Sequence, residues 1–232
     1  MAFFDAIDVQ SFQEKGVIRN NIGGFEPMNL ARWTTLFLST VGLGIAAALA
    51  VGTVVFLINP EVSPEQMGAI GIGYNALQTV IVGSLLGAFS HMGFFAYLTV
   101  NYFAQGIIRN KLIWAYAQVF LIIVVSVYAA VLRTPEGGNF LPYALLPTLV
   151  VLGALLVSRL KVQQTNRGSF IPTMFFMTAV TLLESVPALR QYNAYGTAMM
   201  VLPLFVCNAW QILRLHKIVG PSAKQEPADR AS

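Results

Sequence analysis

Charged residues divide the chain into six long uncharged runs. The runs cover residues 33–60, 66–108, 112–132, 137–158, 168–183 and 191–213. A helix needs about 20 apolar residues to cross the hydrocarbon core of a membrane, and all runs but 168–183 meet this length. That run becomes long enough if its helix continues past Glu184 to about Leu189. The pattern predicts an all-α fold, a polytopic membrane helix bundle with six transmembrane helices.

The run 66–108 is too long for one simple crossing and barely long enough for two crossings with a turn. Gly68, Gly71 and Gly73 lower the helix propensity of its first third. We therefore expect residues 64–79 to lie along the outer surface of the membrane. One tilted helix, formed by about residues 80–107, would then cross the membrane. A re-entrant loop is the alternative, and it would need surrounding protein to satisfy its backbone groups.

The composition favours lipid as the surroundings of this chain. Hydrophobic residues make up 56% of the sequence and charged residues only 10%, with a mean hydropathy of +0.66. Soluble domains carry about 25% charged residues. So few charged side chains cannot cover a globular surface. The net charge of +4 is not a sign of nucleic-acid binding, because its meaning lies in how the basic residues are distributed over the loops.

The basic residues predict the orientation. With six crossings and a cytoplasmic N-terminus, only Arg133 and Arg190 fall in outer loops, beside the acidic Glu61, Glu65, Glu136 and Glu184. The cytoplasmic parts would then hold Lys15, Arg19, Arg32, Arg109, Lys111, Arg159, Lys161, Arg167, Arg214, Lys217, Lys224 and Arg230. This excess follows the positive-inside rule. Two crossings within 66–108 would remove most of it, so both termini are predicted to be cytoplasmic.

Three segments follow from this topology. Residues 1–32 form a cytoplasmic N-terminal segment, of which 1–27 is either a real extension or the product of an early start codon. Residues 33–213 form the membrane domain, with spans at about 34–58, 80–107, 112–132, 140–158, 169–189 and 193–213. Residues 214–232 form a polar cytoplasmic tail that we expect to be disordered. The single Cys207 allows no intramolecular disulfide.

Small residues recur at four-residue intervals in the first two spans. Gly83 and Gly87 precede His91 on one helix face, and the first span repeats the pattern at Gly44, Ala48 and Gly52. Such small-xxx-small patterns let two helices approach closely. We expect these helices to pack together, with His91 hydrogen-bonding across the bundle. The functional alternative for His91 is a proton-sensitive switch or a ligand.

Glu184 is the other ionisable residue within a predicted span, and such residues are costly in lipid. An interfacial carboxylate, paired with Arg190, is one interpretation. A carboxylate that faces a cavity and binds an ion or ligand is the other.

Enzyme motifs are absent from the sequence. There is no HExxH, GxSxG or glycine-rich phosphate loop, and the only other histidine, His216, lies at the predicted cytoplasmic end. Ser90 and His91 are chain neighbours whose side chains diverge on a helix, so they do not form a nucleophile and base. We expect no catalysis, no metal and no cofactor.

One segment carries a family resemblance. The string SHMGFFAYLTVNYFAQGIIRNKLIWAYAQVFLI, residues Ser90–Ile122, resembles the KinB-signalling pathway activation family, KbaA, as does MNLARWTTLFLS from Met28. The resemblance implies an integral protein of the cell membrane of a Gram-positive, endospore-forming bacterium, which activates a membrane histidine kinase of the sporulation phosphorelay. It carries over no catalytic residue. Gly93, Tyr97, Asn101 and Tyr102 are then candidates for helix contacts.

Three functions remain open at this stage. The first is a regulator that activates the kinase through helix–helix contacts. The second is a transporter or channel for an ion or small molecule, which would use His91, Asn101 and Glu184 in one water-accessible cavity. The third is a scaffold for membrane assembly, which the sequence does not separate from a regulator.

Overall fold

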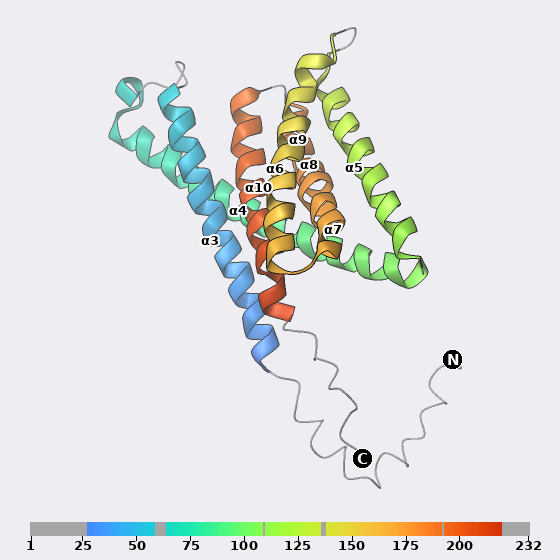
Figure 1. The fold of residues 1–232 in the computed structure, drawn as a ribbon. Helices are drawn as coiled ribbons and strands as arrows, with labels where there is room; N and C mark the ends of the chain where they lie inside the picture. The colour runs from blue at the N-terminus through green and yellow to red at the C-terminus, as the bar shows by residue number, and fades with distance from the viewer. Residues whose placement is uncertain (1–26, 59–63, 109, 136–137, 192, 220–232) are drawn as a thin grey trace, which may run out of the picture. The chain divides into compact units, whose positions relative to one another are not determined.

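The computed structural model describes residues 27–58, 64–108, 110–135, 138–191 and 193–219. Every regular element in these ranges is helical (Figure 1). The chain divides into two compact units, residues 1–35 and 36–232. The described part of the first unit is the beginning of α3, where the Thr35 hydroxyl donates to the Ala31 carbonyl at 2.8 Å. The arrangement described below is that of the second unit.

Among the described residues, five helices are long and apolar enough to cross a membrane. Their elements are α3 (Pro27–Ile58), α4 (Pro64–Ile107), α5 (Lys111–Arg133), α6 (Leu145–Gln164) with the short 3₁₀ helix η1 (Leu141–Ala144) before it, and α10 (Ala194–Val219). The expected all-helical fold is therefore confirmed for the described residues. The count of six crossings and the orientation stay predictions.

Asparagine side chains cap the N-terminal ends of three of these helical segments. Asn110 precedes α5, and its side-chain oxygen accepts from the Leu112 amide at 2.9 Å. Asn139 accepts from the Leu141 amide at 3.1 Å, and Asn193 from the Tyr195 amide at 2.9 Å. Each asparagine satisfies a backbone donor that the first helical turn leaves without an acceptor.

The predicted fifth span is a succession of short helices. The 3₁₀ turn η2 (Arg167–Ser169) leads into α7 (Phe170–Phe175), the π-helical η3 (Phe176–Val180), α8 (Thr181–Glu184) and α9 (Val186–Leu189). Pro187 lies in the first turn of α9 and has no amide hydrogen to continue the ladder of α8. None of these pieces alone has the length of a membrane span, although together they run from one end of the helix group to the other (Figure 1).

The helix α4 differs from the sequence-based expectation. A start near Val80, or a re-entrant loop before it, is not observed, because α4 begins at Pro64 and only Gly68 leaves the helical conformation (φ 61°, ψ 174°). Gly71 and Gly73 lie within the helix, although each glycine costs a helix interior roughly 1 kcal/mol relative to alanine, because helix propensity is a weak local preference that the rest of the segment overrides. Gly68 has the left-handed φ that favours glycine.

The whole apolar part of α4 would fit within the hydrocarbon core of a bilayer only at a steep tilt. Its apolar part has 40 residues, roughly 60 Å at about 1.5 Å per residue, which is twice the thickness of the hydrocarbon core. Figure 1 shows α4 running obliquely behind α10, α6 and α7 to the turn that leads into α5. One oblique helix can therefore accommodate the whole uncharged run. The outer-surface location of residues 64–79 stays a prediction.

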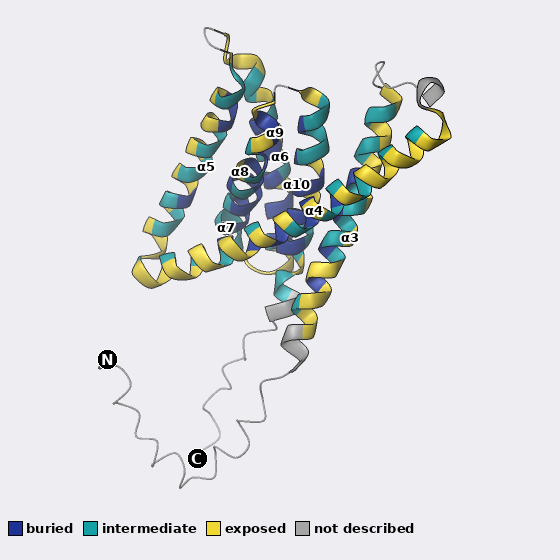
Figure 2. Cartoon of the chain, turned by 180° about the vertical axis from the view of Figure 1, so that it is seen from behind, coloured by how far each residue is buried: buried dark blue, intermediate teal, exposed yellow. Residues whose placement is uncertain are grey.

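The core lies where α10 packs on α4 and where α6 packs on α7. Phe94, Phe176 and Leu204 are fully buried there, and Figure 2 shows the buried residues concentrated on α10 and the α7–α9 segment. A second cluster joins α5, α6, α8, α9 and α10 through Ala129, Val150, Leu182, Leu189 and Val201. Much of the surface of α5 is apolar and exposed, as lipid contact allows.

Candidate functional site

The helices α3 and α4 cross at glycines. A Cβ atom on Gly44 would lie 2.5 Å from the Gly83 carbonyl oxygen, and one on Gly87 would lie 2.7 Å from the Val41 Cα. Both distances are shorter than real Cβ contacts, so only glycine allows the two backbones to approach this closely. Ala48 is fully buried beside them. The structure thus brings together the small residues that the sequence places on these two helix faces.

Gly52 lies further along α3. Its Cβ position would be 3.2 Å from the Thr79 Cγ2, a close but adjustable contact with a side chain. The two helices are therefore closest at the crossing of Gly44, Gly83 and Gly87, and less tightly packed beyond it.

His91 is buried in α4 and reaches α10. Its Nδ1 lies 3.0 Å from Gln211 Oε1, and because a carbonyl oxygen accepts, Nδ1 carries the proton in this bond. The rings of Phe37 and Phe95 flank the imidazole, with centroids at 5.1 and 4.8 Å. The hydrogen bond across the bundle that the sequence led us to expect is made, and its partner is an amide.

Four further side chains extend this bond into a polar network. Gln211 Nε2 donates to Ser90 Oγ at 2.5 Å, and Ser90 Oγ donates to Asn208 Oδ1 at 2.8 Å. Asn208 Nδ2 then donates to Glu184 Oε2 at 2.9 Å and to Thr181 Oγ1 at 3.0 Å. The polar network therefore consists of His91, Gln211, Ser90, Asn208, Thr181 and Glu184. It links α4, α10 and α8, and every bond between His91 and Glu184 donates toward the carboxylate.

Glu184 ends the network in a confined position. The partner of its Oε2 is Asn208, whereas Oε1 is buried with no hydrogen-bond partner among the described residues. The carboxylate lies against Gly93, where a Cβ atom would occupy the position of Oε1. Gly93 therefore makes room for the carboxylate, a role different from the helix contact that the family resemblance implies for it.

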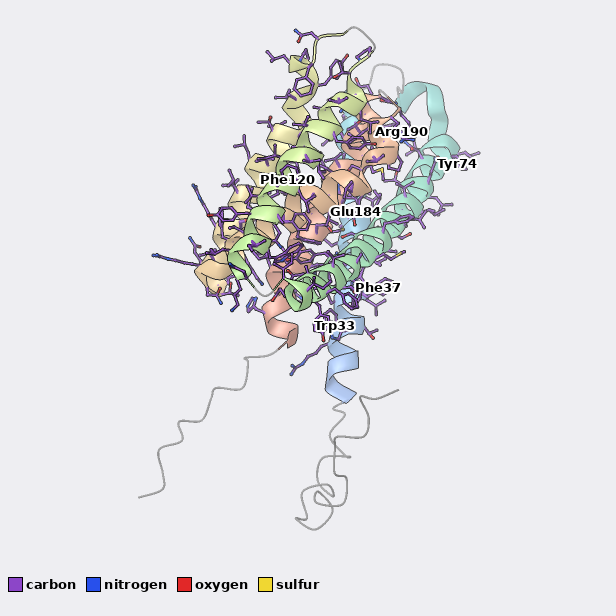
Figure 3. All side chains as sticks on the ribbon, turned by 90° about the vertical axis from the view of Figure 1, so that its right-hand side faces the viewer. Trp33, Phe37, Tyr74, Phe120, Glu184 and Arg190 are labelled. Atoms are coloured by element: carbon purple, nitrogen blue, oxygen red, sulfur yellow. The ribbon has the colours of Figure 1, made fainter. Side chains whose placement is uncertain are left out.

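The pair of Glu184 with Arg190, one of the two interpretations that the sequence left open, is not observed. Arg190 is exposed, and no ion pair joins the two within the described residues. The turn at Ser185 and Pro187 separates them along the chain, and Figure 3 shows the labelled Arg190 displaced from Glu184 along the helix group. The carboxylate consequently turns inward to α10.

The remaining candidates lie outside the polar network. The Tyr97 hydroxyl donates to the Pro172 carbonyl at 3.2 Å, and its ring packs on Phe176. Asn101 accepts from Trp114 Nε1 at 3.0 Å, which ties the end of α4 to α5. Tyr102 is 77% exposed. Asn101 therefore does not join His91 and Glu184, as a shared transport site would require.

Sequence reasoning missed Asn208 and Gln211, which hold the network together. Both are fully buried, and they stand three residues apart on one face of α10. They are the two amides in the second half of the last uncharged run, and that spacing is the signal that could have revealed them.

Two cavities lie away from this network. One, of about 250 Å³, lies between the second half of α3 and the first part of α4. The other, of about 270 Å³, lies between α5, η1 and α6 and is lined almost entirely by apolar groups. No residue of the polar network lines either of them. In the described part of the chain, no three histidine, cysteine or acidic side chains gather as metal ligands would.

The described residues form an all-helical protein in which five helices are long and apolar enough to cross a membrane and a buried polar network joins three of the helical elements. The sequence model of the KbaA family, described as KinB-signalling pathway activation in sporulation, matches residues 35–218. The chain therefore belongs to the KbaA family.

A curated relative supports this assignment. The KinB-signaling pathway activation protein of Bacillus subtilis (strain 168) is 36% identical over 143 residues, which cover 60% of this chain and 72% of the relative. No solved structure matches the chain.

Proposed function

We propose that this protein is an integral membrane activator of the KinB signalling pathway in sporulation, and that it acts by helix contacts with the membrane histidine kinase. Its membership of the KbaA family carries the proposal. The five helices long and apolar enough to cross a membrane support its location in the cell membrane of a sporulating, Gram-positive bacterium. The protein would act there without catalysis.

The distribution of polar and apolar side chains supports a role in binding other membrane helices. His91 and five other polar side chains bond to one another and stabilise the packing of α4, α8 and α10. Large apolar side chains such as Tyr116 and Phe120 of α5 are exposed instead. A protein of this kind can bind other membrane helices by packing and by sparse polar contacts. It activates a kinase only if it binds the active state more tightly than the inactive state.

Transport is a second candidate because the polar network connects His91 to Glu184. The connection passes through the amides of Gln211 and Asn208, and an amide relays a proton only through a rare imidic-acid form. Asn101 lies elsewhere, and neither cavity is lined by the two ionisable residues. Activation through contact is therefore the function that the geometry supports better.

Gene deletion in the host bacterium tests the proposal. We expect loss of KinB-dependent sporulation and of a phosphorelay reporter, and restoration of both by a plasmid copy. A strain in which KinB is the only sporulation kinase makes the assay specific. Normal sporulation of the deletion strain under these conditions would contradict the proposed function. A pure scaffold would instead lower the amount of KinB in the membrane, which an immunoblot measures.

A further inference from the structure

The carboxyl of Glu184 is enclosed between helices and has no basic partner. Asn208 Nδ2 donates to its Oε2 at 2.9 Å, whereas Oε1 is buried and no described residue bonds it. The group lies against Gly93 of α4, where the Cβ atom of any other residue would occupy the position of Oε1. The carboxyl is thus held between α4 and α10, and the one bond that the described residues make to it comes from a neutral amide.

Among the described residues, no cation balances this carboxyl. Arg190 is exposed, and Arg133 at the end of α5 makes no ion pair with Glu184. The other titratable residues of α5 are exposed, and η3 and α9 carry none. The titratable groups that face the carboxyl are therefore His91 of α4, which the polar network connects to it, and Cys207 of α10, which lies close enough to interact with its charge.

This position suits the neutral acid better than the carboxylate. Burying an ion without a counter-ion costs far more than burying a neutral polar group, and a carboxyl avoids that cost by keeping its proton. The neutral acid agrees with the observed bond, because Oε2 accepts from Asn208 as a carbonyl oxygen and Oε1 can carry the proton. A metal cation fits worse, since the Asn208 amide presents N–H to Oε2 and Gly93 lies against Oε1.

We infer that Glu184 is a proton-binding site, whose carboxyl is neutral while α8 packs on α4 and α10, and that loss of the proton weakens this packing at Gly93. The ionised carboxylate needs water, which does not reach the buried Oε1. The packed state therefore binds one more proton than a state in which water reaches the carboxyl. By linkage, each rise of one pH unit shifts the equilibrium away from the packed state by at most about tenfold. This response belongs to the protein alone and does not depend on which partner it binds.

Infrared titration of the purified full chain in detergent tests the protonation state. The C=O stretch of a neutral carboxyl absorbs above the amide I band, and Glu184 is the one acidic residue between Glu136 and Glu226. At neutral pH we expect this band in the wild-type protein and its absence from Glu184→Gln, which keeps the shape of the side chain without an acidic proton. Wild-type and Glu184→Gln spectra that agree in this region at neutral pH would overturn the inference.

Thermal unfolding tests whether the proton supports the packing. Above about pH 5 a carboxyl in water is ionised, so the Tm of the wild-type protein should fall relative to that of Glu184→Gln by up to about 4 °C per pH unit. His91 and Cys207 are present in both proteins, so their titration cancels in this difference. A difference in Tm that stays constant as the pH rises would contradict the coupling.

A matched pair of glycine substitutions tests the place of the carboxyl. In Gly93→Ala the new methyl group takes the position of Oε1 and displaces the carboxyl from the contact, so its infrared band should shift or vanish. Gly106→Ala is the control, because its Cβ position has open space around it, and its band should match the wild-type band. Circular dichroism verifies that both variants remain helical. An unchanged band in Gly93→Ala would place the carboxyl elsewhere and overturn the inference.

Discussion

At the scale of single residues, Asn208 has the most consequential position. Its amide bonds to Ser90 of α4 and to Thr181 and Glu184 of α8, while its own backbone belongs to α10. Removing one partner from a buried network leaves the others unsatisfied, which costs more than the lost bond alone. A single side chain thus couples three helical elements that lie far apart in the sequence.

We expect Asn208→Leu to destabilise the protein by about 2 kcal/mol or more, because three hydrogen bonds are lost in an apolar interior. Asn101→Leu is the control, since Asn101 makes one side-chain bond within the described residues, to Trp114, and its loss should cost about 0.6 kcal/mol. Unfolding of the purified proteins in mixed detergent micelles, followed by circular dichroism, gives both values. Equal stability losses would show that the network has no special weight.

At the scale of elements, the crossing of α3 and α4 depends on backbone contact. Gly44 meets Gly83 and Gly87, and no larger residue fits there. Close backbone approach increases van der Waals packing, which is the main attraction between helices in lipid. The glycines of α4 therefore have two different roles, because Gly73 has open space around its Cβ position.

Alanine substitutions should separate these two roles. Gly87→Ala places a methyl group against the Val41 backbone and should destabilise the protein by about 1–3 kcal/mol, as overpacking does. Gly73→Ala should be neutral or stabilising by up to about 1 kcal/mol, because alanine favours helix. The same detergent unfolding experiment compares them. A stable Gly87→Ala protein would contradict the tight crossing.

The sequence pattern was sufficient to predict the helical elements and part of the candidate site. Uncharged runs predicted the helices, and the four-residue spacing of Gly83, Gly87 and His91 predicted the face toward the first helix. It did not predict the helical start of α4 at Pro64, because glycine propensity is a weak local preference that the surrounding segment overrides. It also did not predict the partners of His91 and Glu184 on α10, since contacts between helices 120 and 24 positions apart in the sequence depend on tertiary packing.

At the scale of the whole molecule, the path of the α7–α9 segment decides the topology. Length and composition identify five candidate spans, whereas the distribution of basic residues favours six crossings. The segment interrupts its α-helix with a π-helical turn and with Pro187. Within the second unit it nevertheless runs beside α6 and α10 from one end of the helix group to the other (Figure 1).

Cysteine labelling on both sides of this segment tests a sixth crossing. In a Cys207→Ala background, we expect Gln191→Cys to react with a membrane-impermeant maleimide in intact protoplasts, because the loop after α9 is predicted to be outside. Gln163→Cys, at the end of α6, should react only after permeabilisation. Both positions are exposed, so a difference in labelling reflects the side of the membrane. Reaction of both positions from the same side would mean that α7–α9 enters the bilayer without crossing it. The C-terminal basic residues would then lie outside, against the positive-inside rule.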